Sequence, residues 1–149
     1  MGYTHYFSGL QCNEELADFA KAAVALSDVQ ICGPTGTGTA VICEDSIQLN
    51  GFAERDEDYE PFILPGFSDN GFCKTARRPY DKVVTAILIA AIAFKTPGWD
   101  QICSDGNEVD WVASGGVALF VRTAKEHYGV ELHSSDVINV IHTCFSRVD

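Results

Sequence analysis

The sequence predicts an α+β fold in which mainly antiparallel strands pack against helices in two layers. Two patterns carry this prediction. Short segments rich in β-branched and aromatic residues, separated by turn residues at hairpin spacing, fill much of the first half of the chain. Longer segments with apolar residues three and four positions apart, typical of amphipathic helices, follow in the second half. Because 149 residues is the length of one ordinary domain, we expect residues 1–149 to form a single core.

The N-terminal region is predicted to contain a strand and then a helix. Residues 2–7 form the strand, which we expect to be the edge or the first strand of the sheet. Asn13 is suited to cap the helix, because its side chain can accept a hydrogen bond from the first turn. The helix presents one apolar stripe, which consists of Leu16, Phe19, Ala23 and Leu26.

The sheet is expected to follow this helix. Turn residues at 33–38, at Glu44-Asp45 and at Asn50-Gly51 separate the strands by hairpin spacings, which favour antiparallel pairing. The predicted strands are residues 29–32, 40–43, 46–49 and 61–64, with a further short strand within residues 67–73.

A long apolar helix is predicted for residues 79–95. Pro79 is a favoured first residue of a helix, and Pro97-Gly98 ends it. Because this segment is apolar almost all round, we expect the helix to be central and buried. No membrane association is expected, because a helix that spans a bilayer needs about 20 apolar residues.

Beyond this helix we expect a strand at residues 99–103 and two further helical regions. The first region begins near Glu108, is interrupted at Gly115-Gly116 and ends at Gly129, which is a natural C-cap. The last helix is capped by Ser134 or Ser135 and continues to Phe145.

The chain is acidic, with a formal net charge of -11. We therefore expect no direct binding of nucleic acid, because neutralising phosphates requires a basic face. The first residues have neither the charged nor the apolar region of a secretory signal, so a cytoplasmic protein with reduced thiols is expected. The six cysteines contain no C-x-x-C pair, and neither a metal nor a cofactor is predicted.

Four of the ten cationic side chains lie between residues 72 and 82. Lys74, Arg77 and Arg78 precede the predicted start of a helix, where unpaired backbone N–H groups and the helix dipole attract anions. The motif therefore predicts a site for phosphate or carboxylate. The alternative interpretation is that these cations neutralise the acidic run at residues 54–60.

Four segments and one tryptophan carry a resemblance: residues 2–6, 47–51, 72–81 and 104–106, and Trp111. Together they resemble a family of small proteins encoded by bacteriophages and prophages, and the central Phe-Cys-Lys-Thr-Ala-Arg-Arg-Pro-Tyr-Asp motif is the most specific part. The resemblance leaves the C-terminal quarter uncovered. It implies a viral origin and a shared site without implying a reaction, and small accessory phage proteins suggest by analogy a role against host defence.

The leading hypothesis is a non-enzymatic viral protein in the host cell cytoplasm that sequesters a small anionic ligand, such as a nucleotide signal. Lys74, Arg77 and Arg78 would hold the phosphate. The residues expected to fix its orientation are His5, Thr75, Tyr80 and Asp105. The second hypothesis is an acidic inhibitor that covers a basic surface of a host effector protein with residues 54–60. Homo-oligomers are left open.

A third hypothesis is a hydrolase or transferase. Cys73 lies near a predicted helix start, which favours its thiolate, and a histidine together with Asp105 could complete a nucleophilic arrangement. The candidate histidines are His5, His133 and His142. The competing interpretation, which we prefer, is that Cys73 is a buried and inert thiol.

Three further motifs have both a functional and a structural interpretation. His133-x-Ser135 has the form of half a two-histidine phosphoesterase site, but capping by Ser135 is preferred. Residues 33–39 are rich in glycine but lack the ending of a phosphate loop, so a hairpin loop is expected. The last motif consists of four polar residues before a predicted helix. They could supply oxygen ligands to a divalent cation, or they could simply be turn residues: Asp105, Asn107, Glu108 and Asp110.

Overall fold

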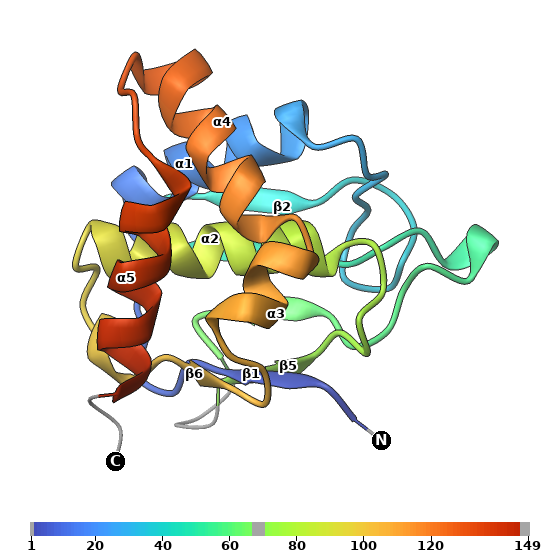
Figure 1. The fold of residues 1–149 in the computed structure, drawn as a ribbon. Coiled ribbons are helices and arrows are strands. Elements are labelled where there is room, and N and C mark those ends of the chain that lie inside the picture. Colours follow the sequence, from blue (N-terminus) through green and yellow to red (C-terminus); the bar gives the residue numbers. More distant parts are fainter. Residues whose placement is uncertain (1, 67–70, 147–149) are drawn as a thin grey trace.

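The computed structural model describes residues 2–66 and 71–146, and it confirms the α+β fold (Figure 1). This part of the chain contains five α-helices and two three-stranded antiparallel sheets. The strands that we expected to share one sheet are therefore divided between two small ones.

The first sheet has the order β5-β1-β6. Its central strand is β1 (Thr4–Tyr6), so the predicted N-terminal strand is confirmed, although it is not an edge strand. β5 (Phe72–Lys74) and β6 (Cys103–Ser104) pair with it on either side. The register places His5 between Cys73 and Ser104. Three segments far apart in the sequence therefore meet at His5.

The second sheet has the order β2-β3-β4. β2 (Val41–Cys43) and β3 (Ser46–Leu49) form the predicted hairpin through a two-residue turn, and β4 (Phe62–Leu64) pairs with β3. The connection from β3 to β4 is longer than a hairpin turn and includes the short 3-10 helix η1 (Ala53–Arg55).

Two predicted strands are wrong. In residues 29–32, the Val29 N–H donates a hydrogen bond to the nearby Ser27 oxygen. The β-pairing in this segment is a single isolated bridge between Cys32 and Asn50. Residues 99–101 form the 3-10 helix η2 (Trp99–Gln101), because their backbone bonds close locally, and β6 begins only after it. The short strand that we predicted within residues 67–73 is present as β5, which begins at Phe72 and ends at Lys74. Residues 67–70 lie outside the described residues.

The helices follow the sequence signals closely. They are α1 (Glu14–Leu26), α2 (Asp81–Ala93), α3 (Glu108–Ala113), α4 (Gly116–Tyr128) and α5 (Ser134–Ser146). Asn13 caps α1 by accepting a hydrogen bond from the Leu16 N–H at 2.9 Å, and Gly129 ends α4 in the left-handed conformation. The predicted cap at Ser134 or Ser135 is wrong, because α5 begins at Ser134 and both serines lie in its first turn.

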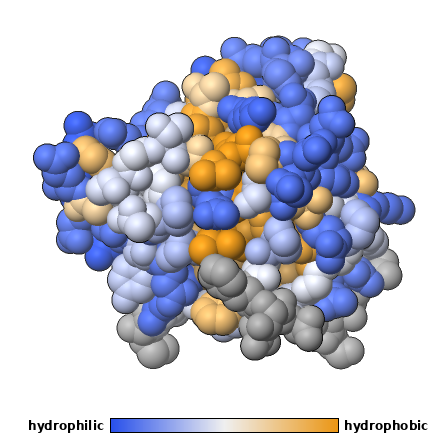
Figure 2. All heavy atoms as spheres, turned by 180° about the vertical axis from the view of Figure 1, so that it is seen from behind, coloured by the Kyte–Doolittle hydropathy of each residue, from blue (hydrophilic) through white to orange (hydrophobic). Residues whose placement is uncertain are grey.

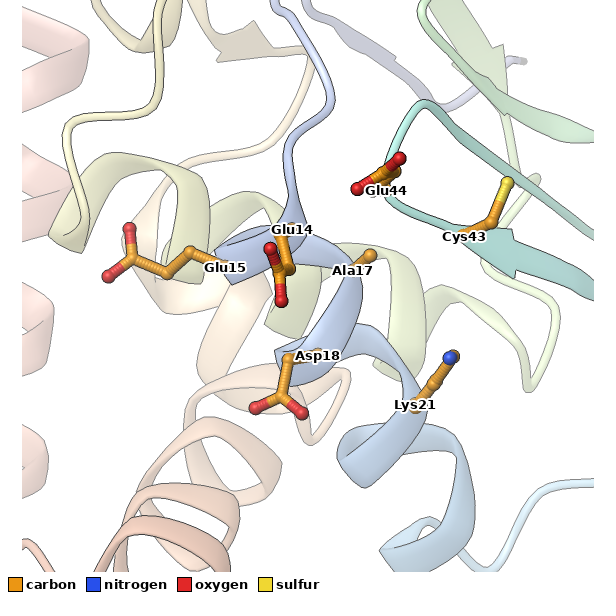
Figure 3. A pocket seen from close by; sticks show the side chains of 7 residues that line it. All are labelled: Glu14, Glu15, Ala17, Asp18, Lys21, Cys43 and Glu44. Carbon is orange, nitrogen blue, oxygen red and sulfur yellow. The ribbon is translucent and has the colours of Figure 1, made fainter.

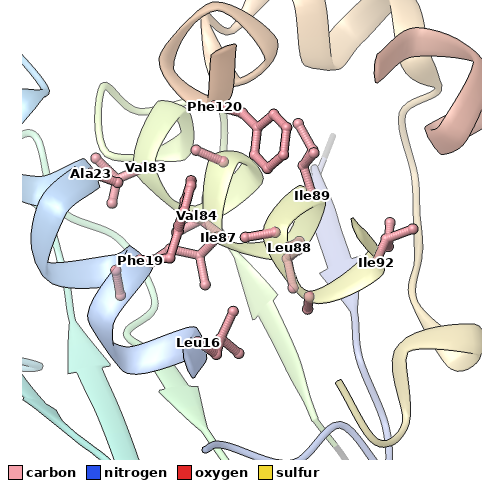
Figure 4. Packing of buried hydrophobic residues seen from close by; sticks show 14 of the residues in the cluster. Leu16, Phe19, Ala23, Val83, Val84, Ile87, Leu88, Ile89, Ile92 and Phe120 are labelled. Atoms are coloured by element: carbon pink, nitrogen blue, oxygen red, sulfur yellow. The ribbon is translucent and has the colours of Figure 1, made fainter. Parts of the chain in front are cut away.

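The core is built around α2, which runs through the middle of the molecule. Eleven of its 13 residues are buried, as the continuous apolar run predicts. Figure 4 shows Leu16 and Phe19 of α1 on one side of this helix and Phe120 of α4 on another. Burying each such side chain contributes about 1.5–3 kcal/mol. This packing holds the start of α2, where the cationic motif ends, in a fixed position.

Within the described residues no helix has the length and apolar character needed to cross a membrane. The surface still exposes apolar area. Figure 2 shows a strip of apolar atoms between hydrophilic areas on the face opposite to that of Figure 1.

Candidate functional site

A buried polar network centres on His5. Its side chain is 0% exposed, and its Nε2 lies 2.6 Å from Oδ1 of Asp81, the first residue of α2. Because a carboxylate only accepts hydrogen bonds, Nε2 carries the hydrogen and donates. The other ring nitrogen, Nδ1, lies 2.7 Å from Oγ of Ser104, and the Thr75 hydroxyl donates to the same Asp81 oxygen at 2.7 Å. The network joins β1, β6 and Thr75, the residue that follows β5, to α2.

The segments that carry the family resemblance meet around this network. Residues 2–6 and 72–81 supply two of its strands, and Ser104 comes from the third. The indole of Trp111 packs edge-on against the His5 ring, with the two centroids 5.4 Å apart. Most of the segments that carry the resemblance therefore meet at one place in the fold, whereas residues 47–51 belong to β3 of the second sheet and the turn after it.

Tyr80 and Cys73 lie fully buried beside the network. The Tyr80 hydroxyl donates to the backbone oxygen of Glu60, and the Cys73 thiol points at the same oxygen from 3.4 Å. Burial raises the pKa of the Cys73 thiol far above its usual range and also raises the pKa of Tyr80. The expectation that Cys73 is buried in the core is therefore confirmed. A buried, protonated thiol is a poor nucleophile, and the lack of reactivity stays a prediction.

Arg77 and Arg78 reach the surface and form weak ion pairs there. Arg77 lies 3.3 Å from a carboxylate oxygen of Asp110, and its guanidinium carbon is 3.9 Å from the centre of the Tyr3 ring. Arg78 donates to the backbone oxygen of Asp56 at 2.8 Å and lies 3.7 Å from its carboxylate. The neutralising interpretation is therefore partly confirmed. Exposed pairs of this kind contribute at most about 1 kcal/mol, so a ligand could replace them.

The expectation of unpaired N–H groups at the start of α2 is wrong. The N–H groups of Asp81, Lys82 and Val83 donate to the backbone oxygens of residues 78, 79 and 80. The Asp81 carboxylate itself stands at the positive end of the helix dipole, which favours a negative charge there. The N–H groups of Asp81, Lys82 and Val83 are therefore not available to an anion at this motif, and its arginine side chains are the main donors.

A cavity of about 270 Å³ opens where the cationic motif meets the end of α3. Both arginines line it, and so does the buried Asp81. The full lining is Arg77, Arg78, Pro79, Asp81, Ala113 and Ser114. Two arginines that line one cavity can hold a phosphate or a carboxylate through charge-assisted hydrogen bonds.

The other predicted site residues do not line this cavity. His5, Thr75 and Tyr80 are 0% exposed, and the first two reach the cavity only through their hydrogen bonds to Asp81. The Lys74 ammonium lies 5.7 Å from the centre of the Tyr59 ring. The Asp105 carboxylate accepts hydrogen bonds from the Thr4 N–H at 3.0 Å and the Tyr6 hydroxyl at 3.2 Å, so it orders the N-terminal strand.

The backbone beneath Arg77 is strained. Ala76 and Arg77 have φ angles of 51° and 59°, in the left-handed region that residues with a side chain rarely adopt. Each such residue costs about 1–2 kcal/mol. Strain of this kind persists where the surrounding structure fixes it, and it often marks a functional site.

The remaining motifs have structural roles. Asn107 and Asp110 form a capping box at the start of α3, so the interpretation as turn residues before a helix is confirmed. The described residues contain no group of acidic, histidine or cysteine side chains suited to hold a metal. The glycine-rich residues 33–39 form a loop closed by a hydrogen bond from the Gly33 N–H to the Thr37 oxygen.

A larger and strongly acidic cavity lies between α1 and β2 (Figure 3). Its volume is about 830 Å³, and its charged lining residues are Glu14, Glu15, Asp18, Lys21 and Glu44. The Asp18 carboxylate accepts hydrogen bonds from Tyr128 and His127, which lower its pKa. The three glutamates form no ion pair with the described part of the chain.

We compared the chain with family models, curated proteins and solved structures, and found no match.

Proposed function

We propose that this protein is a non-enzymatic binder of a small anionic ligand, held by Arg77 and Arg78. The observation that carries the proposal is the cavity of about 270 Å³ that both arginines line. The strained backbone at Ala76 and Arg77 and the stacking of Arg77 on Tyr3 support it, because both fix the direction of one arginine.

The biological role that we propose is sequestration of a nucleotide signal, by a phage accessory protein that acts in the host cytoplasm against host defence. The resemblance to small phage proteins supports this role, and a volume of about 270 Å³ suits a mononucleotide better than a polymer. The acidic character of the whole chain supports a small ligand over a nucleic acid.

The test is the Arg77→Ala/Arg78→Ala double variant. Its affinity for pyrophosphate and for nucleoside monophosphates, measured by calorimetry, is expected to fall by about 2–4 kcal/mol, because charge-assisted hydrogen bonds are the strong ones. The control is Lys21→Ala/Arg55→Ala, which removes the same charge from exposed positions elsewhere. Equal affinity in the double variant and the control would place the site elsewhere.

A second candidate function is binding of a basic protein surface, and the acidic cavity between α1 and β2 favours it. Within residues 54–60, Asp56 pairs with Arg78, and Glu60 accepts a hydrogen bond from the Lys74 N–H. The glutamates Glu14, Glu15 and Glu44 form no ion pair with the described residues, so this cavity is a second acidic surface that can attract a basic partner.

Association with a lysine-rich peptide, measured on a biosensor, shows which of these two acidic surfaces binds a basic partner. We expect Glu14→Gln/Glu15→Gln/Glu44→Gln to slow association and to weaken its salt dependence. The matched variant Glu54→Gln/Glu57→Gln/Asp58→Asn removes the same charge from residues 54–60. If the second variant slows association more, residues 54–60 are the surface that binds the basic partner.

A further inference from the structure

Asp81 differs from the other residues of the arginine cavity because it is charged and buried. Its side chain is 4% exposed, yet it lines the cavity. Its Oδ1 accepts hydrogen bonds from both His5 and Thr75. The carboxylate is therefore held in one orientation by two donors from the core.

The second oxygen of Asp81 is unused. Oδ2 accepts no hydrogen bond from the part of the chain that the structure describes. Oδ2 is also not fully buried. Among the described residues, the fully buried side-chain oxygens and nitrogens that lack a hydrogen-bond partner are the hydroxyls of Tyr3 and Thr96, and Asp81 Oδ2 is not one of them. A carboxylate oxygen that is nearly buried and lacks a donor is costly unless a ligand or water supplies one.

The cavity thus combines two kinds of recognition. The guanidinium groups of Arg77 and Arg78 only donate hydrogen bonds and attract an anion, whereas Asp81 Oδ2 only accepts. A phosphate group whose oxygens carry no proton, such as a monoester dianion, satisfies the arginines but leaves this acceptor without a donor. A compound that carries a phosphate and, a few bonds away, an O–H or N–H group satisfies both.

We propose that the ligand class of this cavity is a phosphate monoester with hydroxyl or amino donors near the phosphate, and that Asp81 selects it by accepting a hydrogen bond from such a donor. This inference rests on the proposed function, since it concerns the same cavity. Nucleoside monophosphates and sugar phosphates share this chemistry, and the cavity of about 270 Å³ is large enough for a phosphate with a sugar-sized group.

The test compares two ligands that differ only in their donors. Glycerol 3-phosphate and propyl phosphate have the same phosphate monoester and the same chain length, but only the first has hydroxyl groups. We expect the wild-type protein to bind glycerol 3-phosphate about 10- to 100-fold more tightly, because a hydrogen bond to a buried charge is among the stronger ones. Ribose 5-phosphate and adenosine 5′-monophosphate then distinguish a sugar phosphate from a nucleotide.

The matched variant is Asp81→Asn. Its carbonyl oxygen can still accept from His5 and Thr75, while its amide nitrogen takes the place of Oδ2 and can only donate. The variant is expected to lose the preference for glycerol 3-phosphate over propyl phosphate. The comparison in the wild-type protein decides the matter even where Asp81→Asn fails to fold.

The outcomes separate this inference from the proposed function. Equal affinity of the wild type for the two ligands overturns the role of Asp81 and leaves the arginine site standing. A preference that persists in folded Asp81→Asn also overturns it. Absence of binding for all four phosphate compounds removes the proposed function and this inference together.

Discussion

His5 and Asp81 share a hydrogen bond of 2.6 Å between Nε2 and Oδ1, and both side chains are buried. The bond connects the central strand of the first sheet to the first residue of the central helix. Removing one partner leaves the other without its hydrogen bond inside the protein, which is more costly than never burying the pair.

We therefore expect Asp81→Ala to lower the free energy of unfolding by about 3–5 kcal/mol, because it leaves the donors of His5 and Thr75 without an acceptor. Urea denaturation followed by circular dichroism measures the change. Asp28→Ala, which removes the same charge from an exposed position, is the control and is expected to change stability by less than about 0.5 kcal/mol. A loss below about 1 kcal/mol in Asp81→Ala would mean that water replaces the pair.

Local sequence signals predicted the helices well. Asn13 before α1, the Gly115-Gly116 break and Gly129 after α4 act within a few residues, so each can be recognised in the sequence. The wrong strands at residues 29–32 and 99–103 have suitable composition, but their backbone groups bond locally instead. Composition alone does not report where backbone hydrogen bonds go.

The candidate site was predicted only in part, for a physical reason. Arg77 and Arg78 could be recognised because they are adjacent cations in an acidic chain. Asp81 and Ser104 were missed as partners of His5, because they lie 76 and 99 residues away and only the folded sheet brings them together. One signal was present: Asp81 ends the specific motif and is acidic in the first turn of a helix, where a carboxylate is often functional or capping.

The cysteines should differ sharply in reactivity. Burial raises the pKa of Cys73, whereas Cys43 is exposed. With iodoacetamide in the native state, mass spectrometry is expected to find Cys43 modified first and Cys73 unmodified, and both modified after unfolding in guanidinium chloride. Rapid modification of Cys73 in the native protein would revive the hypothesis of a thiol-dependent enzyme.

Asp110 should make stability depend on pH. Its pKa lies below the usual value, first because it accepts a hydrogen bond from the Asn107 N–H and further because Arg77 is near. A carboxyl group with a lowered folded-state pKa contributes stability above its unfolded pKa of about 3.9, and this contribution is lost as the pH falls through the folded pKa.

We expect Asp110→Ala to cost about 1 kcal/mol at pH 7, the usual effect of losing a cap, and less than half of that at about pH 2.5. Urea denaturation of wild type and variant at both pH values measures the difference. A difference that is the same at both values would show that the charge of Asp110 has no part in the cap.

Because the backbone at Ala76 is strained, one substitution there should raise the free energy of unfolding while it weakens ligand binding. Ala76→Gly removes a side chain from a residue with φ of 51°, so it is expected to raise the free energy of unfolding by up to about 1 kcal/mol. If the strain aims Arg77, the same variant binds pyrophosphate more weakly. Ala22→Gly, within α1, is the control and is expected to cost about 1 kcal/mol without changing affinity. Destabilisation by Ala76→Gly would contradict the strain argument.

Asp56 competes with any ligand for Arg78, because its carboxylate lies 3.7 Å from the guanidinium group. Asp56→Asn removes this competition, and asparagine tolerates the left-handed φ of 58° at this position, so the fold should persist. Since exposed ion pairs contribute little, we expect the affinity for pyrophosphate, measured by calorimetry, to rise about two- to fivefold. Glu54→Gln is the control for the change in net charge, because no ion pair joins Glu54 to the described residues. An equal rise in both variants would mean that general charge, and not release of Arg78, controls the affinity.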